Sequence, residues 1–202
     1  MKHAIIGAGA IGTALARVFE RTNVEVSIAN SRGPETLAAL ARELGPNVSP
    51  CSVQDAVKAD VIFLAVPFPT HGSVAGLLPD WSGKIVVDTT NTLDLSPAVR
   101  RELGSDYSSE VVARAFRGAR LVKAFNHLPA RHLGTNPPVA GQRQAVFIAS
   151  DDTGASASVA TLVEQLGFAP VELGSLARGG APLHVVDGQP DGLLFQNLVK
   201  LD

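Results

Sequence analysis

The feature of this sequence that most constrains its fold is a glycine-rich turn at residues 7–12, which reads Gly-Ala-Gly-Ala-Ile-Gly. A short apolar run, Ala4–Ile6, lies directly before the turn and is typical of a buried strand. The residues after the turn's second glycine place one apolar stripe along a helix: Ile11, Leu15, Val18 and Phe19. A strand, a G-x-G-x-x-G turn and a helix in this order are typical of the first unit of a doubly wound α/β domain.

Apolar runs and segments of helical period alternate along the rest of the chain. The predicted strands are short apolar runs: Val24–Ala29, Val61–Val66, Ile85–Val87, Leu121–Phe125 and Ala145–Ala149. The predicted helices are residues 34–44, a short helix capped by Ser52 and Asp55, Val74–Leu78, Glu110–Phe116, and a helix whose stripe is Val159, Leu162, Val163 and Leu166. Such alternation produces right-handed βαβ crossovers, so we expect a Rossmann-type α/β fold with a doubly wound parallel sheet.

Two consecutive prolines at 137–138 precede the last strand–helix unit. We therefore predict a dinucleotide-binding Rossmann domain over residues 1–135 and a short C-terminal α/β extension over residues 136–202. The end of the extension is rich in glycine and proline, as loops are, and the segment Leu193–Leu201 fits a helix.

The composition excludes several other classes of protein. The chain carries 17 basic and 19 acidic side chains, for a net charge of -2, and no basic cluster interleaves with aromatics, so we expect no nucleic-acid partner. It contains no apolar run long enough to span a bilayer, so we expect no membrane partner. A single cysteine, Cys51, excludes an intramolecular disulfide and fits a reducing compartment, so we expect a cytoplasmic protein.

The three glycines of the turn predict a dinucleotide ligand. Gly7 permits the tight turn, Gly9 lets the backbone approach a pyrophosphate, and Gly12 lets the helix pack closely on the strand. Ala10 and Ile11 open the helix, whose free N–H groups and partial positive charge favour phosphate groups. A glycine turn without a ligand is the alternative, but the strand before the turn and the helix after it favour the ligand.

The end of the second predicted strand indicates which dinucleotide is bound. An NAD site usually carries Asp or Glu there to accept from the ribose 2′-hydroxyl, whereas this chain carries Asn30, Ser31 and Arg32. The Arg32 guanidinium can pair with a 2′-phosphate through two N–H groups, and the Ser31 hydroxyl can donate to the same phosphate. We therefore predict NADP(H) as the cofactor, with a solvated surface arginine as the alternative.

Polar or rigid turns follow three further predicted strands, at the edge where ligands of open α/β sheets bind. Two prolines frame a rigid turn after Val61–Val66, hydroxyl and amide groups follow Ile85–Val87, and an Asn-His pair follows Leu121–Phe125. Each turn alone would fit an ordinary polar loop, but together they predict a nicotinamide pocket. Its predicted members are Ala65, Val66, Pro67, Thr89, Asn91, Ala124 and Asn126.

His127 is the one side chain at these strand ends whose ordinary pKa lies near neutrality. It is a candidate catalytic residue, either orienting the hydride acceptor or supplying a proton, and a purely structural histidine is the alternative. The sequence contains no H-E-x-x-H metal motif and no G-x-S-x-G nucleophile motif. We therefore predict neither a metal site nor nucleophilic catalysis.

Taken together, the motifs of residues 1–130 resemble those of the 8-hydroxy-5-deazaflavin (coenzyme F420)-dependent NADP oxidoreductases. The segments that carry the resemblance are 5–12, 30–34, 65–67, 88–91 and 123–126. The resemblance implies that the glycine turn holds the pyrophosphate, that Ser31 and Arg32 hold the 2′-phosphate, and that hydride passes directly between the nicotinamide and the deazaflavin ring. It also implies a homodimer whose C-terminal part covers the acceptor site, for which Glu172–His184 is suitable loop material.

These observations lead to the hypothesis of an NADPH-dependent oxidoreductase that transfers hydride to a small-molecule acceptor, either coenzyme F420 or a flavin-like ring. Two alternatives stay open. One is the reduction of a small imine or carbonyl compound, although such enzymes usually add a large helical domain, for which the residues after 135 leave little room. The other is a non-catalytic NADP-binding sensor, which is compatible with the lack of a marked pair of catalytic side chains.

Overall fold

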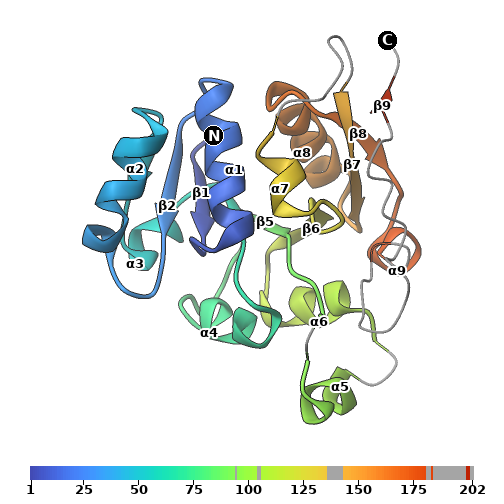
Figure 1. Ribbon diagram of the computed structural model, residues 1–202. Helices are drawn as coiled ribbons and strands as arrows, with labels where there is room; N and C mark the ends of the chain where they lie inside the picture. The colour runs from blue at the N-terminus through green and yellow to red at the C-terminus, as the bar shows by residue number, and fades with distance from the viewer. Residues whose placement is uncertain (94, 104–105, 136–142, 181–182, 184–198, 201–202) are drawn as a thin grey trace.

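One twisted sheet runs through the molecule, and helices cover both of its faces (Figure 1). The computed structural model describes residues 1–93, 95–103, 106–135, 143–180, 183 and 199–200. The strands are β1 His3–Ile6, β2 Val26–Ala29, β3 Val48–Pro50, β4 Val61–Leu64, β5 Ile85–Asp88, β6 Arg120–Ala124, β7 Arg143–Ser150, β8 Ala169–Glu172 and β9 Val199–Lys200.

The strand order, β3-β2-β1-β4-β5-β6-β7-β8, places β1 and β4 side by side in the interior of the sheet. From β1 the chain moves outward to β2 and β3, and then returns to β4 and continues outward in the opposite direction. The carboxyl ends of β1 and β4 therefore form a topological switch point, which is where open α/β sheets bind their ligands. The predicted Rossmann-type α/β fold is confirmed.

The sheet departs from the predicted parallel arrangement at one place. β6 and β7 pair antiparallel, with Val122 opposite Ser150 and Ala124 opposite Ile148, whereas β7 and β8 pair parallel. β7 therefore begins beside the carboxyl end of β6. β9 adds a second antiparallel pairing on β7. The predicted extension thus continues the same sheet, and the boundary at residue 135 stays a prediction.

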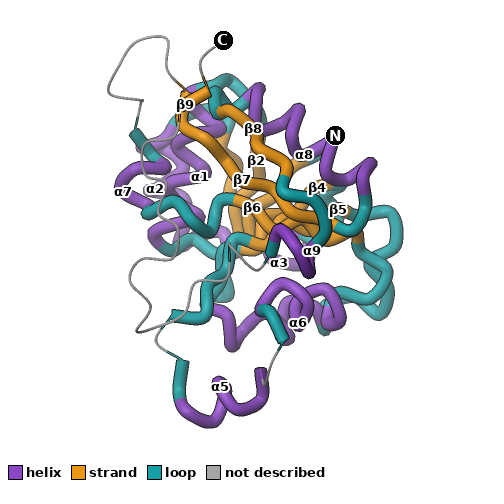
Figure 2. The backbone as a smooth tube through the Cα atoms, turned by 90° about the vertical axis from the view of Figure 1, so that its right-hand side faces the viewer, coloured by secondary structure: helices purple, strands orange, loops and turns teal. Residues whose placement is uncertain are grey.

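The helices fall into two layers, visible on different sides of the strands in Figure 2. They are α1 Ala10–Arg21, η1 Pro34–Leu37, α2 Ala38–Leu44, α3 Val53–Ala56, η2 Phe68–Thr70, α4 His71–Ala75, α5 Pro97–Leu103, α6 Ser108–Ala115, α7 Ala130–Leu133, α8 Thr153–Gln165 and α9 Leu176–Gly179. One apolar core lies between the sheet and the layer of α1, α7 and α8, and a second lies between the sheet and the layer of α3, α4 and α6.

Aromatic rings fix the packing of both cores. In the first core, the rings of Phe19 and Phe63 meet edge to face with their centroids 5.4 Å apart. In the second, Trp81 and Phe116 meet at 4.8 Å, and the Trp81 indole N–H donates to the Ala75 carbonyl at 2.9 Å. Because both faces of the sheet are covered, β4 and β5 are buried along their whole length, as their continuous apolar runs predict.

Several element boundaries differ from the predictions, for local reasons. The predicted helix 34–44 begins as the 3₁₀ turn η1, and the three-residue strand β3 escaped prediction because it is short and ends in proline. Helix α5 was not predicted. The predicted helix at Leu193–Leu201 lies mostly outside the described residues, and the two residues described there, 199–200, form a strand.

Candidate functional site

A cleft of about 830 Å³ opens at the carboxyl ends of the central strands. The predicted site residues that line it come from the glycine turn, the end of β2 and the end of β4: Gly7, Gly9, Asn30, Ser31, Arg32, Ala65, Val66 and Pro67. Further lining residues that sequence reasoning missed come from α3, η2 and α4: Ser52, Val53, Gln54, Thr70, Ser73, Val74 and Leu77. The structure therefore joins the first two predicted groups, the glycine turn and the Asn-Ser-Arg loop, in one cavity.

The glycine turn shows three different steric environments. Gly7 has φ of 112°, and a Cβ on it would lie 2.1 Å from the Ala65 carbonyl oxygen. A Cβ on Gly12 would lie 1.8 Å from the Gly7 carbonyl oxygen, because α1 packs directly on the turn. A Cβ on Gly9, in contrast, would have no atom within 4 Å. Gly7 and Gly12 are thus required by the fold, whereas Gly9 leaves open space beside the cleft.

The amino end of α1 is left free for a ligand. Gly9 is its N-cap, no side chain caps it, and no acidic residue lies in its first turn. A twelve-residue helix presents unsatisfied N–H groups and partial positive charge at such an end, as a phosphate ligand requires. Of the predicted contacts there, Ala10 is exposed and Ile11 half-buried, and Ala10 lines an adjoining hollow between α1 and α7.

Hydrogen bonds within the loop after β2 hold the predicted 2′-phosphate site in shape. Asn30 Oδ1 accepts from the Arg32 backbone N–H at 2.9 Å, and Asn30 Nδ2 donates to Thr36 Oγ1 at 3.0 Å. Thr36 Oγ1 in turn donates to the Gly33 carbonyl at 2.8 Å. Ser31 and Arg32 stay exposed and line the cleft. Asn30 therefore acts through the loop conformation, which leaves the two exposed side chains to meet a ligand.

One acidic side chain in this loop escaped the sequence reasoning. The Glu35 carboxylate folds back over Gly33, so that a Cβ on Gly33 would lie 2.4 Å from Glu35 Oε1. A negative charge here opposes the binding of a 2′-phosphate, so it partly offsets the attraction of Arg32. Its position, two residues after Gly33, is visible in the sequence, but the direction of its side chain is not.

Loss of the Thr36 hydroxyl should weaken the selection of NADPH over NADH through its effect on the conformation of this loop. We expect Thr36→Val to lower the affinity for NADPH about fivefold, equivalent to about 1 kcal/mol, because the Asn30–Gly33 loop loses a hydrogen-bonded link. The affinity for NADH should stay within about twofold, since NADH carries no 2′-phosphate for this loop to bind. Titration calorimetry checks this, with Thr161→Val on the surface of α8 as the matched control; equal losses for both cofactors would contradict it.

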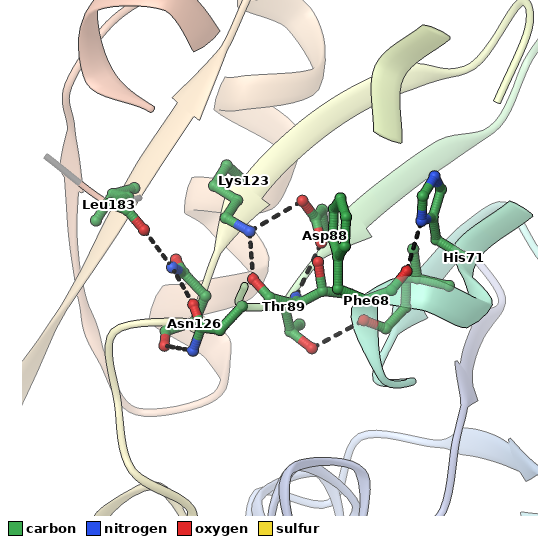
Figure 3. A network of polar contacts seen from close by, with 10 residues as sticks. Phe68, His71, Asp88, Thr89, Lys123, Asn126 and Leu183 are labelled. Atoms are coloured by element: carbon green, nitrogen blue, oxygen red, sulfur yellow. Dashed lines mark hydrogen bonds and ion pairs between the residues drawn. The ribbon is translucent and has the colours of Figure 1, made fainter. Parts of the chain in front are cut away.

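The remaining predicted residues lie at the ends of β5 and β6, where Figure 3 labels Thr89 and Asn126. Thr89 Oγ1 donates to the Leu64 carbonyl at 2.9 Å, which ties the end of β5 to β4. Asn91 and Asn126 bind each other: Asn91 Nδ2 donates to the Asn126 carbonyl at 2.8 Å, and Asn126 Nδ2 donates to Asn91 Oδ1 at 2.9 Å. Thr89, Asn91, Ala124 and Asn126 do not line the cleft, so their contacts with a cofactor stay a prediction.

Sequence reasoning missed the charges that lie beneath this group. Asp88 ends β5, Lys123 lies opposite it in β6, and the two side chains form a buried ion pair. A lysine and an aspartate one strand apart cannot be paired from sequence alone, because the pairing depends on the strand register. The one available signal was that Lys123 interrupts an apolar strand and that Asp88 ends another.

His127 lies away from the cleft and packs against β7. It is 3% exposed, its Nε2 lies 3.3 Å from the Ala145 carbonyl, and its ring contacts that of Phe147 at 4.9 Å. Burial disfavours the charged imidazolium and lowers the pKa of His127 to about 4, only partly opposed by the hydrogen bond to Ala145. The side chain is therefore neutral near pH 7 and links β6 to β7. Its catalytic role stays a prediction to which this geometry gives no support.

The buried neutral His127 should make the protein less stable in acid. A folded-state pKa of about 4, below the ordinary 6.5, means that its contribution is fully present above pH 6.5 and is lost as the pH falls towards 4. We expect the free energy of unfolding to fall by up to ~3 kcal/mol over this range from this group. Urea unfolding of the wild type and of His127→Gln checks this, since the difference between their pH profiles removes the carboxylate contribution; parallel profiles would contradict it.

The described residues contain no cluster of histidine, cysteine, aspartate or glutamate that could hold a metal ion. Within the same part of the chain, no helix has both the length and the apolar character needed to cross a bilayer.

A doubly wound sheet whose cleft combines a glycine turn with an Asn-Ser-Arg loop places the chain in the class of Rossmann-fold proteins. The sequence profile of one family in this class, described as NADP oxidoreductase coenzyme F420-dependent, matches residues 2–92. These residues, somewhat under half of the chain, are similar to that family. The resemblance predicted from its motifs is thus confirmed, and this similarity supports the prediction of an NADPH-dependent oxidoreductase.

Two solved structures share substantial sequence identity with this chain. A hypothetical protein from Sinorhizobium meliloti is 40% identical, with a TM-score of 0.88, over 100% of this chain and 96% of the other. A protein from Arthrobacter sp. FB24 that carries the name of an F420-dependent NADP reductase is 29% identical, with a TM-score of 0.73, over 91% of this chain and 90% of the other. Imine reductase from Pseudomonas sp., at 19% identity and a TM-score of 0.59, shares the fold.

The curated relatives are much longer proteins. Metalloreductase STEAP3 from Rattus norvegicus is 32% identical over 178 residues, which make up 87% of this chain and 34% of the relative. Metalloreductase STEAP2 from Homo sapiens is 30% identical over 175 residues, 33% of its length. The chain thus spans about a third of the length of the curated relatives it matches.

Proposed function

We propose that this protein transfers hydride between NADPH and a flat conjugated acceptor, either a deazaflavin such as coenzyme F420 or a flavin-like ring. The observation that carries the proposal is the cleft itself, in which the open side of Gly9 and the Ser31-Arg32 pair face one cavity. In this arrangement the start of α1 binds the pyrophosphate, and Arg32 pairs with the 2′-phosphate. The family description and the name of the Arthrobacter relative support a deazaflavin as the acceptor.

The strand order supports one direction for the proposed cofactor. The proposed 2′-phosphate site is at the end of β2, the proposed pyrophosphate site is at the end of β1, and the next strands in the sheet are β4, β5 and β6. Neighbouring strands are about 4.8 Å apart, so the ends of β5 and β6 lie about 14–19 Å from β2. The nicotinamide half would extend along this edge, past Val66 and Pro67 and towards Thr89 and Asn91.

NADPH when bound supplies the hydride, and the protein's contribution would be to hold two rings in contact. The rigid Val66–Pro67 turn and the hydrogen-bonded ends of β5 and β6 offer such a surface with little need for proton transfer. The neutral, buried His127 accords with chemistry of this kind, since direct hydride transfer between rings requires no strong acid near the cleft. The segment after residue 135 would cover the acceptor, because the Leu183 carbonyl already accepts from Asn126 Nδ2 at 2.6 Å. The predicted homodimer is part of the same proposal.

A panel of acceptors tests the proposal. NADPH oxidation would be followed by absorbance with oxidised coenzyme F420, FMN, a quinone and a cyclic imine in turn. We expect turnover with coenzyme F420 or FMN at least about tenfold faster than with the imine, because two stacked rings fix the distance of hydride transfer. Faster turnover with the imine would favour the alternative of imine reduction. Tight NADPH binding without turnover of any acceptor would contradict the proposal and favour a sensor.

A further inference from the structure

A fully buried ion pair lies beneath the ends of β5 and β6 (Figure 3). Lys123 Nζ lies 3.0 Å from Asp88 Oδ2, and the two side chains are 1% and 0% exposed. The desolvation of two such charges often costs more than their attraction returns, so apolar side chains of similar size would give a sheet of comparable stability. Stability alone therefore does not explain why this pair is charged.

Both members of the pair bind the backbone of the same residue. The Thr90 N–H donates to Asp88 Oδ1 at 2.9 Å, and Lys123 Nζ donates to the Thr90 carbonyl oxygen. Hydrogen bonds in which one partner is charged are the stronger kind, and here two of them fix the N–H and the C=O of Thr90. The ion pair thus determines the conformation of the turn that follows β5.

The turn after β6 is fixed against the turn after β5. Phe125 has φ of 64°, a conformation that a bulky side chain rarely adopts, and its ring is fully buried. This bend brings Asn126 to Asn91, where the two amides bind each other. Strained residues of this kind persist only where the surrounding structure holds them, and they concentrate at functional sites.

Two buried polar atoms in these turns are left without a partner. Thr90 Oγ1 and Asn126 Oδ1 are inaccessible to solvent and make no hydrogen bond within the described part of the chain. Thr90 and Asn126 are each 3% exposed. A hydroxyl that can donate and an amide oxygen that can accept together complement a primary carboxamide, which offers one C=O acceptor and one NH₂ donor.

We propose that Asp88 and Lys123 are positioning residues that hold Thr90 and Asn126 ready to bind the carboxamide of the nicotinamide ring. The Thr90 hydroxyl donates to the carboxamide oxygen, and Asn126 Oδ1 accepts from its NH₂ group. The inference deepens the proposed function and rests on it, since it requires NADP(H) to lie across the sheet. It adds Thr90, Asp88 and Lys123 to the residues predicted from sequence.

A comparison of two ligands tests this inference without any acceptor. NADP⁺ carries the nicotinamide, whereas 2′,5′-ADP contains only the adenosine of the cofactor with its 2′- and 5′-phosphates. Thr90→Val, which keeps the shape of the side chain, should weaken NADP⁺ about tenfold and leave 2′,5′-ADP within about twofold. The double variant Asp88→Leu/Lys123→Met should show the same selective loss. It removes the groups that fix Thr90 and fills their space with apolar side chains of similar size.

Matched controls separate positioning from folding. Lys84→Met makes the same change at a half-buried lysine that directly precedes β5, at the other end of that strand from Asp88. Its Nζ donates to the Ala59 carbonyl at 3.0 Å. We expect this variant to change neither affinity. Lys123→Met alone leaves Asp88 buried without its partner, so we expect this single variant to be less stable than the double variant. Urea unfolding of all variants measures this difference.

The outcomes separate the inference from the proposed function. Wild-type protein that binds 2′,5′-ADP and NADP⁺, with both affinities unchanged in Thr90→Val and in the double variant, would overturn the inference and leave the cofactor site intact. Failure of the wild type to bind 2′,5′-ADP would overturn the proposed function itself. Equal losses for both ligands in a stably folded variant would show a general structural role and would also overturn the inference.

Discussion

Replacement of Gly9 by valine is expected to lower the affinity for NADPH by about 100-fold or more, equivalent to about 3 kcal/mol. The backbone of Gly9 has φ of -81° and ψ of -163°, which any residue can adopt, and a Cβ there would meet no atom within 4 Å. The valine side chain would instead occupy the space that the pyrophosphate needs. The free energy of unfolding should fall by no more than about 1–2 kcal/mol, the cost of a β-branched residue at the helix N-cap.

The same substitution at Gly12 provides the contrast. A Cβ there would lie 1.8 Å from a backbone oxygen, so Gly12→Val must displace α1 from the sheet and should cost about 3 kcal/mol or more in stability. Urea unfolding combined with NADPH fluorescence titration measures both effects for both variants. If Gly9→Val binds NADPH as the wild type does, the glycine turn has only a structural role.

Removal of the Arg32 side chain is expected to weaken NADPH by about 1.5–3 kcal/mol and NADH by much less. Arg32 lines the cleft at the end of β2, and it makes no ion pair with the described residues that would compete for a phosphate. Glu35→Gln should change selectivity in the opposite direction, tightening NADPH, because it removes a negative charge from the same loop.

Titration calorimetry with NADPH and NADH on Arg32→Ala, Glu35→Gln and the control Arg42→Ala checks these expectations. Arg42 is exposed on α2 and does not line the cleft, so its loss should change neither affinity. A loss on Arg32→Ala that is equal for both cofactors would refute the 2′-phosphate role. A weaker binding of NADPH to Glu35→Gln would refute the electrostatic account of the loop.

Much of the fold could be predicted from sequence because its signals are local. The apolar runs that become β1, β4 and β5, the stripe of α1 and the Ser52–Asp55 cap of α3 all depend on neighbours within a few residues. The direction of β7 could not be predicted in this way. It depends on which end of β6 lies beside the start of β7, and no local sequence pattern indicates which end that is.

The site divides in the same way. The glycine turn and the Asn30–Arg32 loop are contiguous motifs, and the structure brings both to one cleft, as expected. The Asp88–Lys123 pair results instead from the register of β5 and β6, and the contacts of His127 result from β7 lying beside β6. A histidine just after a strand therefore looks available for chemistry in the sequence, whereas the structure places it in the core.

The most direct test of hydride transfer follows a label. NADPH deuterated at nicotinamide C4 would be incubated with the protein and oxidised coenzyme F420, and the products examined by mass spectrometry and NMR. We expect the deuterium in the reduced deazaflavin at the ring carbon that replaces the flavin nitrogen, with a primary isotope effect on the rate, because the two rings exchange hydride directly. Deuterium released to water, or no consumption of NADPH by a protein that binds it, would contradict the proposed function.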